Sequence, residues 1–280
     1  MTTAPHNACR PIGVFDSGLG GLTVVRRILD RLGGEDIVYL GDSARVPYGN
    51  KSPETVRKFA LEDLAFLQRF DPKIIVVACN TASAVALEAL RAASNVPVLG
   101  MVAPAAARAV QCAGGGPIGV IGTEGTIGSG AYQRAIAEFN RDIQVFAAAA
   151  PLLVPIVEEG RAQDDPIVLH VLGDYLHQMQ RARPTVLILG CTHYPLLARA
   201  IEKLMGPDTA LLDPGEAAAE AVVEVLAREG LTRPAAGGSM RFFSTDNAER
   251  FARLARRFLG REVAGVTQVG VDELVAPRPE

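Results

Sequence analysis

Two cysteines stand at matching points of two similar segments, each directly after a run of apolar residues. The run over residues 74–78 continues into Cys79, and the run over 186–190 continues into Cys191. Both runs are short and continuously apolar, which is typical of strands buried on both faces of a parallel sheet. Helix-like sequence follows each cysteine, so both thiols are expected at the carboxyl end of a strand, where open α/β sheets bind ligands.

The residues around the two thiols favour chemistry over simple packing. A single cysteine that ends a buried strand is most often a small apolar core residue. Here, however, Asn80 and Thr81 follow one thiol, and Thr192 and His193 follow the other. A helix N-terminus at each position would favour the thiolate over the thiol. Two equivalent thiols indicate a reaction that approaches one substrate from two sides.

A second pair of segments indicates that the chain consists of two related halves. Residues 12–18 (IGVFDSG) resemble residues 118–124 (IGVIGTE), which lie 106 positions later (118 − 12 = 106). The two cysteines are 112 positions apart (191 − 79 = 112). Two matches in the same order at nearly the same offset predict internal pseudo-symmetry with small insertions between.

Polar residues are also expected at the other turns of this edge. Asp16 and Ser17 precede a glycine-rich turn that lacks the spacing of a dinucleotide fingerprint and the lysine of a P-loop. An acid at such a turn favours a cationic partner such as an α-ammonium group, although a helix-capping role is the alternative. The loop over 41–49 ends in Pro47-Tyr48-Gly49, which offers backbone N–H groups and the Tyr48 hydroxyl, or forms a plain surface turn.

The second half offers comparable groups. Thr123 and Thr126 occupy the turn that matches Asp16 and Ser17, and they are expected to donate hydrogen bonds. Glu158 is an acid within an apolar segment, for which capping or solvation is the competing interpretation.

Metal and redox chemistry compete with acid–base chemistry at the thiols. Cys191 and His193 have the spacing of a metal pair, but zinc needs three or four protein ligands, and no tight cluster with His170 and His177 completes the set. A redox dithiol would normally present Cys-x-x-Cys, which is absent from the sequence. Neither a metal site nor a redox dithiol is therefore expected.

The bulk composition is that of an ordinary globular protein. The chain has 280 residues, of which 49% are hydrophobic, and a formal net charge of −3. Nucleic acid is not expected as a partner, because the only local group of basic residues, Arg253, Arg256 and Arg257, is best interpreted as a solvated helix face. No signal peptide, long apolar span or disulfide framework is recognisable, which favours a cytoplasmic protein without membrane contact.

Strand-like and helix-like segments alternate along almost the whole chain, which predicts an α/β protein with doubly wound parallel sheets. Ser52 followed by Pro53 predicts the start of a helix that extends to about residue 70. Helices are also expected over 82–93, over 196–204 and from Asp213 to before Gly230. Strands are expected near 12–15, 36–40, 74–78, 96–100, 118–121, 143–147, 185–189, 209–212, 240–243 and 263–266.

In combination, these motifs resemble the glutamate racemases of the aspartate/glutamate racemase superfamily. The strong matches are 14–21 (VFDSGLGG), 41–49 (GDSARVPYG), 78–83 (ACNTAS) and 189–196 (LGCTHYPL), with weaker ones over 122–132 and 151–158. They run in order from about residue 12 to 216, and no core position departs from the pattern.

The resemblance implies a cofactor-independent, two-base interconversion of L- and D-glutamate that supplies D-glutamate for bacterial peptidoglycan. It also implies that each chain has two pseudo-symmetric α/β domains that face each other across a central cleft. A homodimer of such chains is expected. The first domain is expected to comprise 10–98 plus 209–280, and the second 99–208. Cys79 and Cys191 would be the acid–base pair, assisted by Asp16, His193 and Glu158. The residues implied in substrate binding are Asp16, Ser17, Pro47, Tyr48, Gly49, Asn80, Thr81, Thr123, Thr126, Thr192 and His193.

The chemistry agrees with this resemblance. Inverting a carbon centre requires proton removal on one face and proton delivery on the other, so two groups must flank the Cα. Thiols whose pKa is brought from about 8.5 towards neutral suit both tasks. Two alternatives stay open at this point: a related racemase acting on aspartate, and a two-lobed amino-acid-binding protein, which would not need two thiols.

Overall fold

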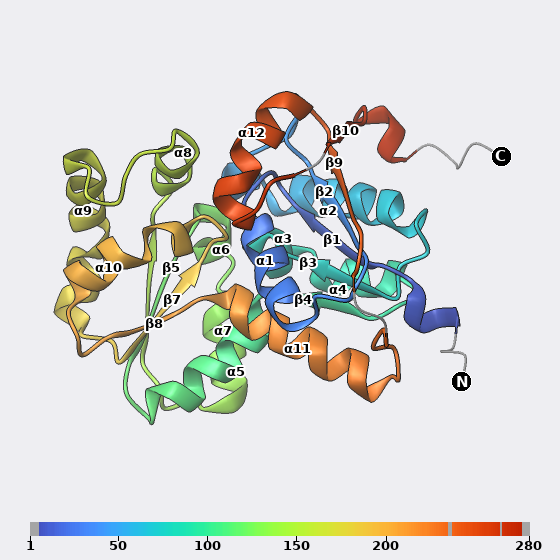
Figure 1. The fold of residues 1–280 in the computed structure, drawn as a ribbon. Helices are drawn as coiled ribbons and strands as arrows, with labels where there is room; N and C mark the ends of the chain where they lie inside the picture. The colour runs from blue at the N-terminus through green and yellow to red at the C-terminus, as the bar shows by residue number, and fades with distance from the viewer. Residues whose placement is uncertain (1–5, 235–236, 264, 276–280) are drawn as a thin grey trace.

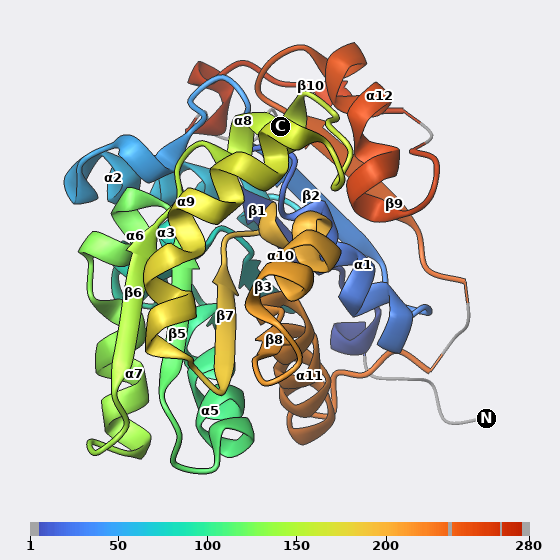
Figure 2. The same cartoon turned by 90° about the vertical axis from the view of Figure 1, so that its left-hand side faces the viewer.

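The computed structural model describes residues 6–234, 237–263 and 265–275, and it contains two parallel β-sheets that lie side by side with helices around them (Figures 1 and 2). The first sheet has six strands in the order β10-β9-β2-β1-β3-β4. Its strands are β1 Ile12–Asp16, β2 Ile37–Gly41, β3 Ile74–Val77, β4 Val98–Gly100, β9 Met240–Ser244 and β10 Thr267–Gln268. The second sheet has four strands in the order β6-β5-β7-β8. They are β5 Ile118–Gly122, β6 Val145–Ala149, β7 Val186–Gly190 and β8 Ala210–Leu212.

The two sheets confirm the predicted pseudo-symmetry. Four strands of the first sheet run β2-β1-β3-β4, and the whole second sheet runs β6-β5-β7-β8, so each strand has a counterpart in the same position. In particular, β3 and β7 are equivalent, and each precedes one of the two cysteines. The duplicated sequence therefore folds into duplicated sheets.

The helices cover both faces of these sheets, as expected for crossovers between parallel strands. Those of the first part of the chain are α1 Leu22–Arg31, α2 Pro53–Gln68, α3 Asn80–Val85, α4 Leu87–Ala93 and α5 Val102–Ala113. The remaining α-helices are α6 Glu124–Gly128, α7 Ala131–Phe139, α8 Leu153–Glu158, α9 Pro166–Ala182, α10 Ala198–Met205, α11 Pro214–Arg228 and α12 Ala248–Leu259. Short 3₁₀ turns are η1 His6–Cys9, η2 Tyr48–Asn50, η3 Tyr194–Leu197 and η4 Asp272–Leu274.

The central strands form where the sequence predicts buried apolar runs. Every residue of β1, β2, β3, β5 and β7 is buried, which accounts for their continuous apolar sequence. At β3, Ile74 and Val76 belong to one apolar cluster, and Ile75 and Val77 belong to another on the opposite face. Because both faces are buried, the sheet holds the loops at its carboxyl edge on a rigid base.

The structure differs from the sequence prediction in the division of the chain. Residues from 209 onward were expected with the first domain, but β8 pairs with β7 in the second sheet. Residues 99 and 100, expected in the second domain, belong to β4, which pairs with β3 in the first sheet. Pseudo-symmetry explains both differences, because β8 in the second sheet is the counterpart of β4 in the first.

Local differences have backbone causes. The helix expected over 82–93 is broken at Ala86, which separates α3 from α4 with φ −118° and ψ −11°. The helix expected over 196–204 begins with the 3₁₀ turn η3 before α10 continues it. The strand expected over 263–266, of which residue 264 lies outside the described part, is replaced by β10 at Thr267–Gln268.

Within the described residues, no helix combines the length and apolar character needed to span a bilayer.

Candidate active site

Loops from the carboxyl edges of both sheets enclose one small cavity of about 30 Å³. The first sheet contributes the turns after β1, β2 and β3, and the second contributes the segments after β5, β6 and β7. The residues around the cavity are Asp16, Ser17, Val46, Pro47, Tyr48, Gly49, Cys79, Asn80, Thr81, Thr123, Val154, Cys191, Thr192 and His193. Both thiols therefore face the same enclosed space, each from a different sheet.

Cys79 ends the segment after β3 and is the N-cap residue of α3. Its side chain is buried, and its Sγ–H donates to Ser17 Oγ at 3.8 Å. Burial, and next to it the charge of Asp16, raises the pKa of the Cys79 thiol to about 12. The sequence prediction that the helix N-terminus makes this thiol acidic is therefore wrong in this structure, because desolvation outweighs the helix dipole.

Cys191 follows β7 and precedes the 3₁₀ turn η3, so no α-helix begins directly after it. The α-helix N-terminus expected near Cys191 is therefore absent, and α10 begins only at Ala198. Its Sγ lies 3.9 Å from Nδ1 of His193, whose Nε2–H donates to Glu158 Oε1 at 3.1 Å. Cys191, His193 and Glu158 thus form a chain of contacts that leads away from the cavity.

The imidazole of His193 is held in its charged form. Burial opposes the charge, but the hydrogen bonds with Cys191 and Glu158 and the charges of Cys191 and Asp16 outweigh it and raise the pKa of His193 to about 10. The hydrogen bond from His193 also lowers the pKa of Glu158, against the effect of its partial burial. A cationic donor therefore stands beside one of the two thiols at neutral pH.

Asp16, at the end of β1, is buried and lines the cavity. Its Oδ2 accepts a hydrogen bond from the backbone N–H of Gly18 at 3.1 Å, whereas Oδ1 has no hydrogen-bond partner among the described residues. Burial raises the pKa of Asp16, and the positive charge of His193 opposes that shift. A buried carboxylate with an unpartnered oxygen is costly to the fold, so it is a strong candidate for binding a cation.

The two halves also meet directly at the cavity. Thr81 Oγ1 lies 2.8 Å from Thr123 Oγ1 and 3.2 Å from Thr126 Oγ1. A side chain on Gly49 would place a Cβ 2.5 Å from Thr123 Cβ, so only glycine allows this approach. Thr126 does not line the cavity itself but supports the two threonines that do.

The Tyr48 hydroxyl does not point at the cavity as the sequence suggested. It lies 2.9 Å from Asp63 Oδ2 and also contacts Asp42. Arg45 joins the same group, with its Nε 2.6 Å from Asp42 Oδ2 and one Nη 3.2 Å from Asp63 Oδ1. Burial and the charge of Asp42 raise the pKa of Asp63 well above its usual range, so a proton is retained between these carboxyl groups and Tyr48. The network fixes the loop, which leaves the backbone of 47–49 to line the cavity.

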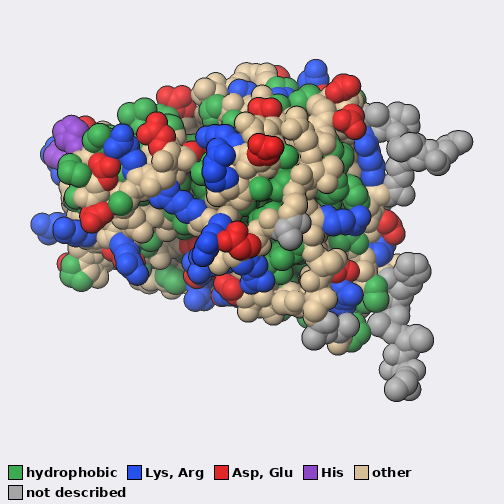
Figure 3. All heavy atoms as spheres, turned by 45° about the horizontal axis from the view of Figure 1, so that its top comes forward, with side chains coloured by type: hydrophobic (Ala, Val, Ile, Leu, Met, Phe, Trp, Pro, Cys, Tyr) green, Lys and Arg blue, Asp and Glu red, His purple; other side chains and the backbone are tan. Residues whose placement is uncertain are grey.

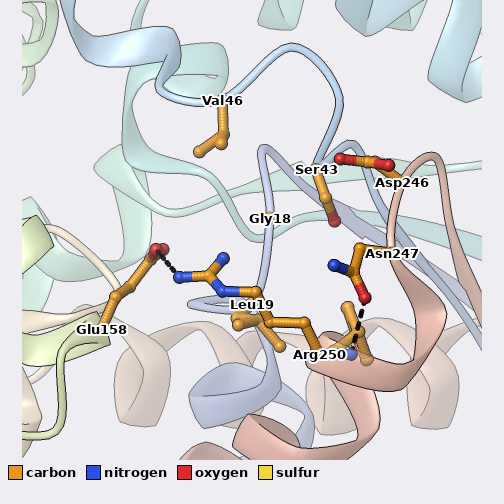
Figure 4. Close-up of a pocket in the computed structure, with 9 residues that line it drawn as sticks. Gly18, Leu19, Ser43, Val46, Glu158, Asp246, Asn247 and Arg250 are labelled. Carbon is orange, nitrogen blue, oxygen red and sulfur yellow. Dashed lines mark hydrogen bonds and ion pairs between the residues drawn. The ribbon is translucent and has the colours of Figure 1, made fainter.

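Glu158 lies behind His193 and lines a neighbouring cavity of about 80 Å³ rather than the central one (Figure 4). Across that second cavity, Arg250 of α12 points at Glu158, with Nη2 3.6 Å from Oε2. The sequence did not indicate Val46, Val154 or Arg250, since nothing in the linear pattern relates α12 to a segment roughly 100 positions earlier.

Of the four residues considered for a metal, only Cys191 and His193 lie together. Among the described residues, no three His, Cys, Asp or Glu side chains form a group that would hold a metal ion. His170 and His177 are exposed on α9. On the face shown in Figure 3, basic and acidic side chains are interspersed.

A comparison with known proteins gives the class of this fold and site. The chain belongs to the Asp/Glu/hydantoin racemase family, whose sequence model matches residues 12–222. It is 46% identical over 265 residues to a glutamate racemase of Geobacter metallireducens, a match that covers 94% of this chain and 97% of the relative.

Solved structures agree with this assignment. The glutamate racemase of Francisella tularensis, in complex with D-glutamate, superposes with a TM-score of 0.89 at 36% identity and covers 95% of this chain and 99% of its own. The glutamate racemase of Thermus thermophilus, in complex with β-chloro-D-alanine, has a TM-score of 0.85 at 45% identity with coverages of 95% and 99%.

Proposed function

We propose that this protein interconverts L- and D-glutamate by two proton transfers at Cα, one to or from Cys79 and the other to or from Cys191. The observation that carries the proposal is the position of these thiols, which reach a single cavity from two pseudo-symmetric sheets. In each direction one thiolate removes the α-proton, and the opposite thiol then donates its own proton to the other face of the carbanion. The thiols exchange roles between the two directions.

Apart from the His193 imidazolium beside Cys191, the site supplies neutral hydrogen-bond donors for the carboxylates of the substrate. The donors that line the cavity include the hydroxyls of Ser17, Thr81, Thr123 and Thr192 and the amide of Asn80. In our proposal these donors, together with the backbone of 47–49, hold the two carboxylates. They also stabilise the negative charge that develops when the proton leaves Cα. The unpartnered Oδ1 of Asp16 then accepts from the α-ammonium group.

His193 stabilises the thiolate of Cys191. The imidazolium is close enough to the sulfur to favour its charge, and Glu158 keeps the ring oriented and protonated. Among the described residues, the polar side chains that act on Cys79 are Ser17 and Asp16, and neither is a cation like His193. In this proposal the ammonium group of the bound substrate offsets the charge of Asp16. The pKa of the Cys79 thiol is thereby lowered, and the thiolate forms more readily.

The biological role follows from the family rather than from the site. Glutamate racemases supply D-glutamate for bacterial cell-wall peptidoglycan, and we propose the same role here. A cytoplasmic location and a homodimer remain predictions. Sedimentation of the purified protein would test the dimer.

Optical activity gives the direct test. Purified protein is incubated with L-glutamate and, separately, with D-glutamate, and both solutions are expected to lose their rotation without added cofactor and after exhaustive chelation. The Cys79→Ser/Cys191→Ser protein is the control and should leave both rotations unchanged. Aspartate enantiomers, tested in parallel, distinguish glutamate from a shorter acid. No loss of rotation, or a loss abolished by chelation and restored by metal, would contradict the proposal.

A further inference from the structure

Helix α12 belongs to the first half of the molecule but reaches the second. It follows β9, which pairs with β2 in the first sheet, and the side chain of Asn247 caps it by accepting a hydrogen bond from the Arg250 N–H at 2.9 Å. Both ribbon views show α12 near α8 of the second half, at the end of the molecule where the sheets' carboxyl edges lie (Figures 1 and 2).

Three side chains of α12 contact the second half from one helix face. Arg250, Arg257 and Phe258 are seven and eight positions apart, a spacing that places them on the same side of an α-helix. The neighbouring Arg253 and Arg256 are exposed, as the sequence predicted for this basic group. Arg257 departs from that prediction, because its guanidinium is directed at the second half.

Arg257 binds the end of α8. One Nη donates to Val157 O at 2.9 Å, and the other donates to Arg161 O at 2.8 Å. Carbonyls at a helix C-terminus lack partners within the helix, so a cation is favoured there. Gly160 has φ +83°, and a Cβ on it would lie only 3.2 Å from Arg257 Nη1, so this turn suits the approach of the guanidinium.

The other two side chains contact the acid–base residues themselves. Arg250 pairs with Glu158 Oε2 at 3.6 Å, on the side of the carboxylate opposite His193 (Figure 4). The Phe258 ring packs on the His193 imidazole at a centroid distance of 5.3 Å and an interplanar angle of 80°. All three contacts therefore converge on the chain Glu158–His193–Cys191.

Building on the proposed function, we propose that α12 is an interdomain latch in which Arg250 and Arg257 are positioning residues for one of the two thiols. By holding the end of α8, they fix Glu158 and so aim His193 at Cys191. Cys79 has a different polar partner, Ser17, on the turn after β1. The latch therefore acts on the proton transfer of Cys191 and spares that of Cys79.

Rates alone cannot reveal this asymmetry. The two enantiomers have equal free energies, so any variant must lower kcat/KM equally in both directions. The isotope effect on kcat/KM with glutamate deuterated at Cα can reveal it, because it measures how far removal of that deuteron limits the reaction. The two enantiomers are deprotonated by different thiols, and each isotope effect thus reports on one thiol.

The experiment measures both isotope effects in the wild type, Arg257→Met and Arg250→Gln. We expect kcat/KM to fall roughly tenfold, since small displacements of catalytic groups are costly. One isotope effect should rise and the other should fall, in the same sense as in Glu158→Gln, which disrupts the chain of contacts directly. Arg253→Gln and Arg256→Gln, which remove the same charge from the same helix, should stay within twofold of the wild type. Arg250→Lys should recover part of the loss.

Three outcomes would contradict either the interdomain latch or the proposed function. A lower rate with an unchanged pair of isotope effects would show that α12 supports both proton transfers alike. An unchanged rate would show that α12 does not position the catalytic groups at all. If Arg257→Met does not fold, Arg250→Gln decides the matter, because that side chain is half exposed and its loss leaves the core intact. A wild type that does not racemise glutamate would overturn the proposed function, and the latch with it.

Discussion

Tyr132 and Asn80 come from different halves of the molecule and are joined by a buried hydrogen bond of 2.6 Å, which the Tyr132 hydroxyl donates to Asn80 Oδ1. Asn80 directly follows Cys79 and lines the central cavity, whereas Tyr132 is a buried residue of α7 in the second half. The bond leaves the amide nitrogen of Asn80 available to donate into the cavity. One thiol loop is therefore held in place by the opposite half.

We expect Tyr132→Phe to weaken substrate binding more than turnover. The substitution leaves Asn80 Oδ1 without a buried donor, at a cost of about 1–3 kcal/mol. The amide would then rotate to find another donor, which raises KM several-fold. Steady-state kinetics and a thermal melt would check both effects. An unchanged KM and Tm would show that this bond does not fix the Cys79 loop.

Replacing either thiol should abolish inversion but leave proton exchange at Cα by the remaining thiol. In heavy water the wild type should place deuterium at Cα mainly in the enantiomer that it produces, because the base that removes a proton is not the acid that delivers one. Cys79→Ser and Cys191→Ser each keep one competent thiol. Residual α-proton exchange, followed by NMR, should favour opposite enantiomers in the two variants. The same preference in both, or full racemisation by either, would indicate a single base.

The activity should depend on the charge of His193. Its pKa of about 10 lies above the ordinary value of 6.5, so kcat/KM should decline as the pH rises through about 10. Glu158→Gln removes one cause of the raised pKa and should move this decline to lower pH. A titration of the His193 ring by NMR in both proteins would measure the shift. A decline at the same pH in the wild type and in Glu158→Gln would show that Glu158 does not influence the charge of His193.

The same pKa predicts a change in stability. The protonated imidazolium stabilises the folded state fully below about pH 6.5, and that contribution is lost as the pH rises from 6.5 through about 10. Unfolding by urea should therefore show a larger destabilisation by Glu158→Gln at pH 6 than at pH 10.

Asp16→Asn should slow the reaction without harming the fold. The carboxylate is buried with one unpartnered oxygen, so a neutral amide relieves a desolvation cost and should leave Tm equal or higher. The ammonium group of the substrate would lose its ionic partner, and we expect kcat/KM to fall on the order of a hundredfold, or about 2.7 kcal/mol. An unaltered kcat/KM would show that Asp16 serves only to accept the hydrogen bond from Gly18 N–H and does not bind the substrate.

Lys73 provides a contrasting test at the other end of β3 from Cys79. Its buried Nζ donates to Ala8 O and Leu231 O, both at 2.8 Å, and pairs with Glu35. Lys73→Met leaves the Glu35 charge buried without a cation, so it should cost about 3–5 kcal/mol of unfolding free energy. Adding Glu35→Gln should recover part of this loss. Because the amine lies far from the cavity along the strand, kcat/KM of the folded protein should stay within twofold, and a large fall would show that this pair influences the site.

The sequence by itself determined the central strands and their duplication. Apolar runs such as those of β3 and β7 form buried strands because their side chains favour burial on both faces, and this property is local. The positions of Cys79 and Cys191 follow directly, since each must come where its strand ends. The turns of Asp16 and Thr123 follow for the same reason.

Only the tertiary structure decided what surrounds each of these groups. The acidity expected for Cys79 is reversed because burial removes water from the thiol, an effect of the surrounding packing that no local pattern contains. The Tyr48 hydroxyl turns to Asp63, and Arg250 reaches Glu158, through contacts between segments that are separate in the chain. Distances and desolvation depend on how the two sheets and α12 pack together. The sequence therefore determined which residues could react, and the packing decided their charge, their partners and their orientation.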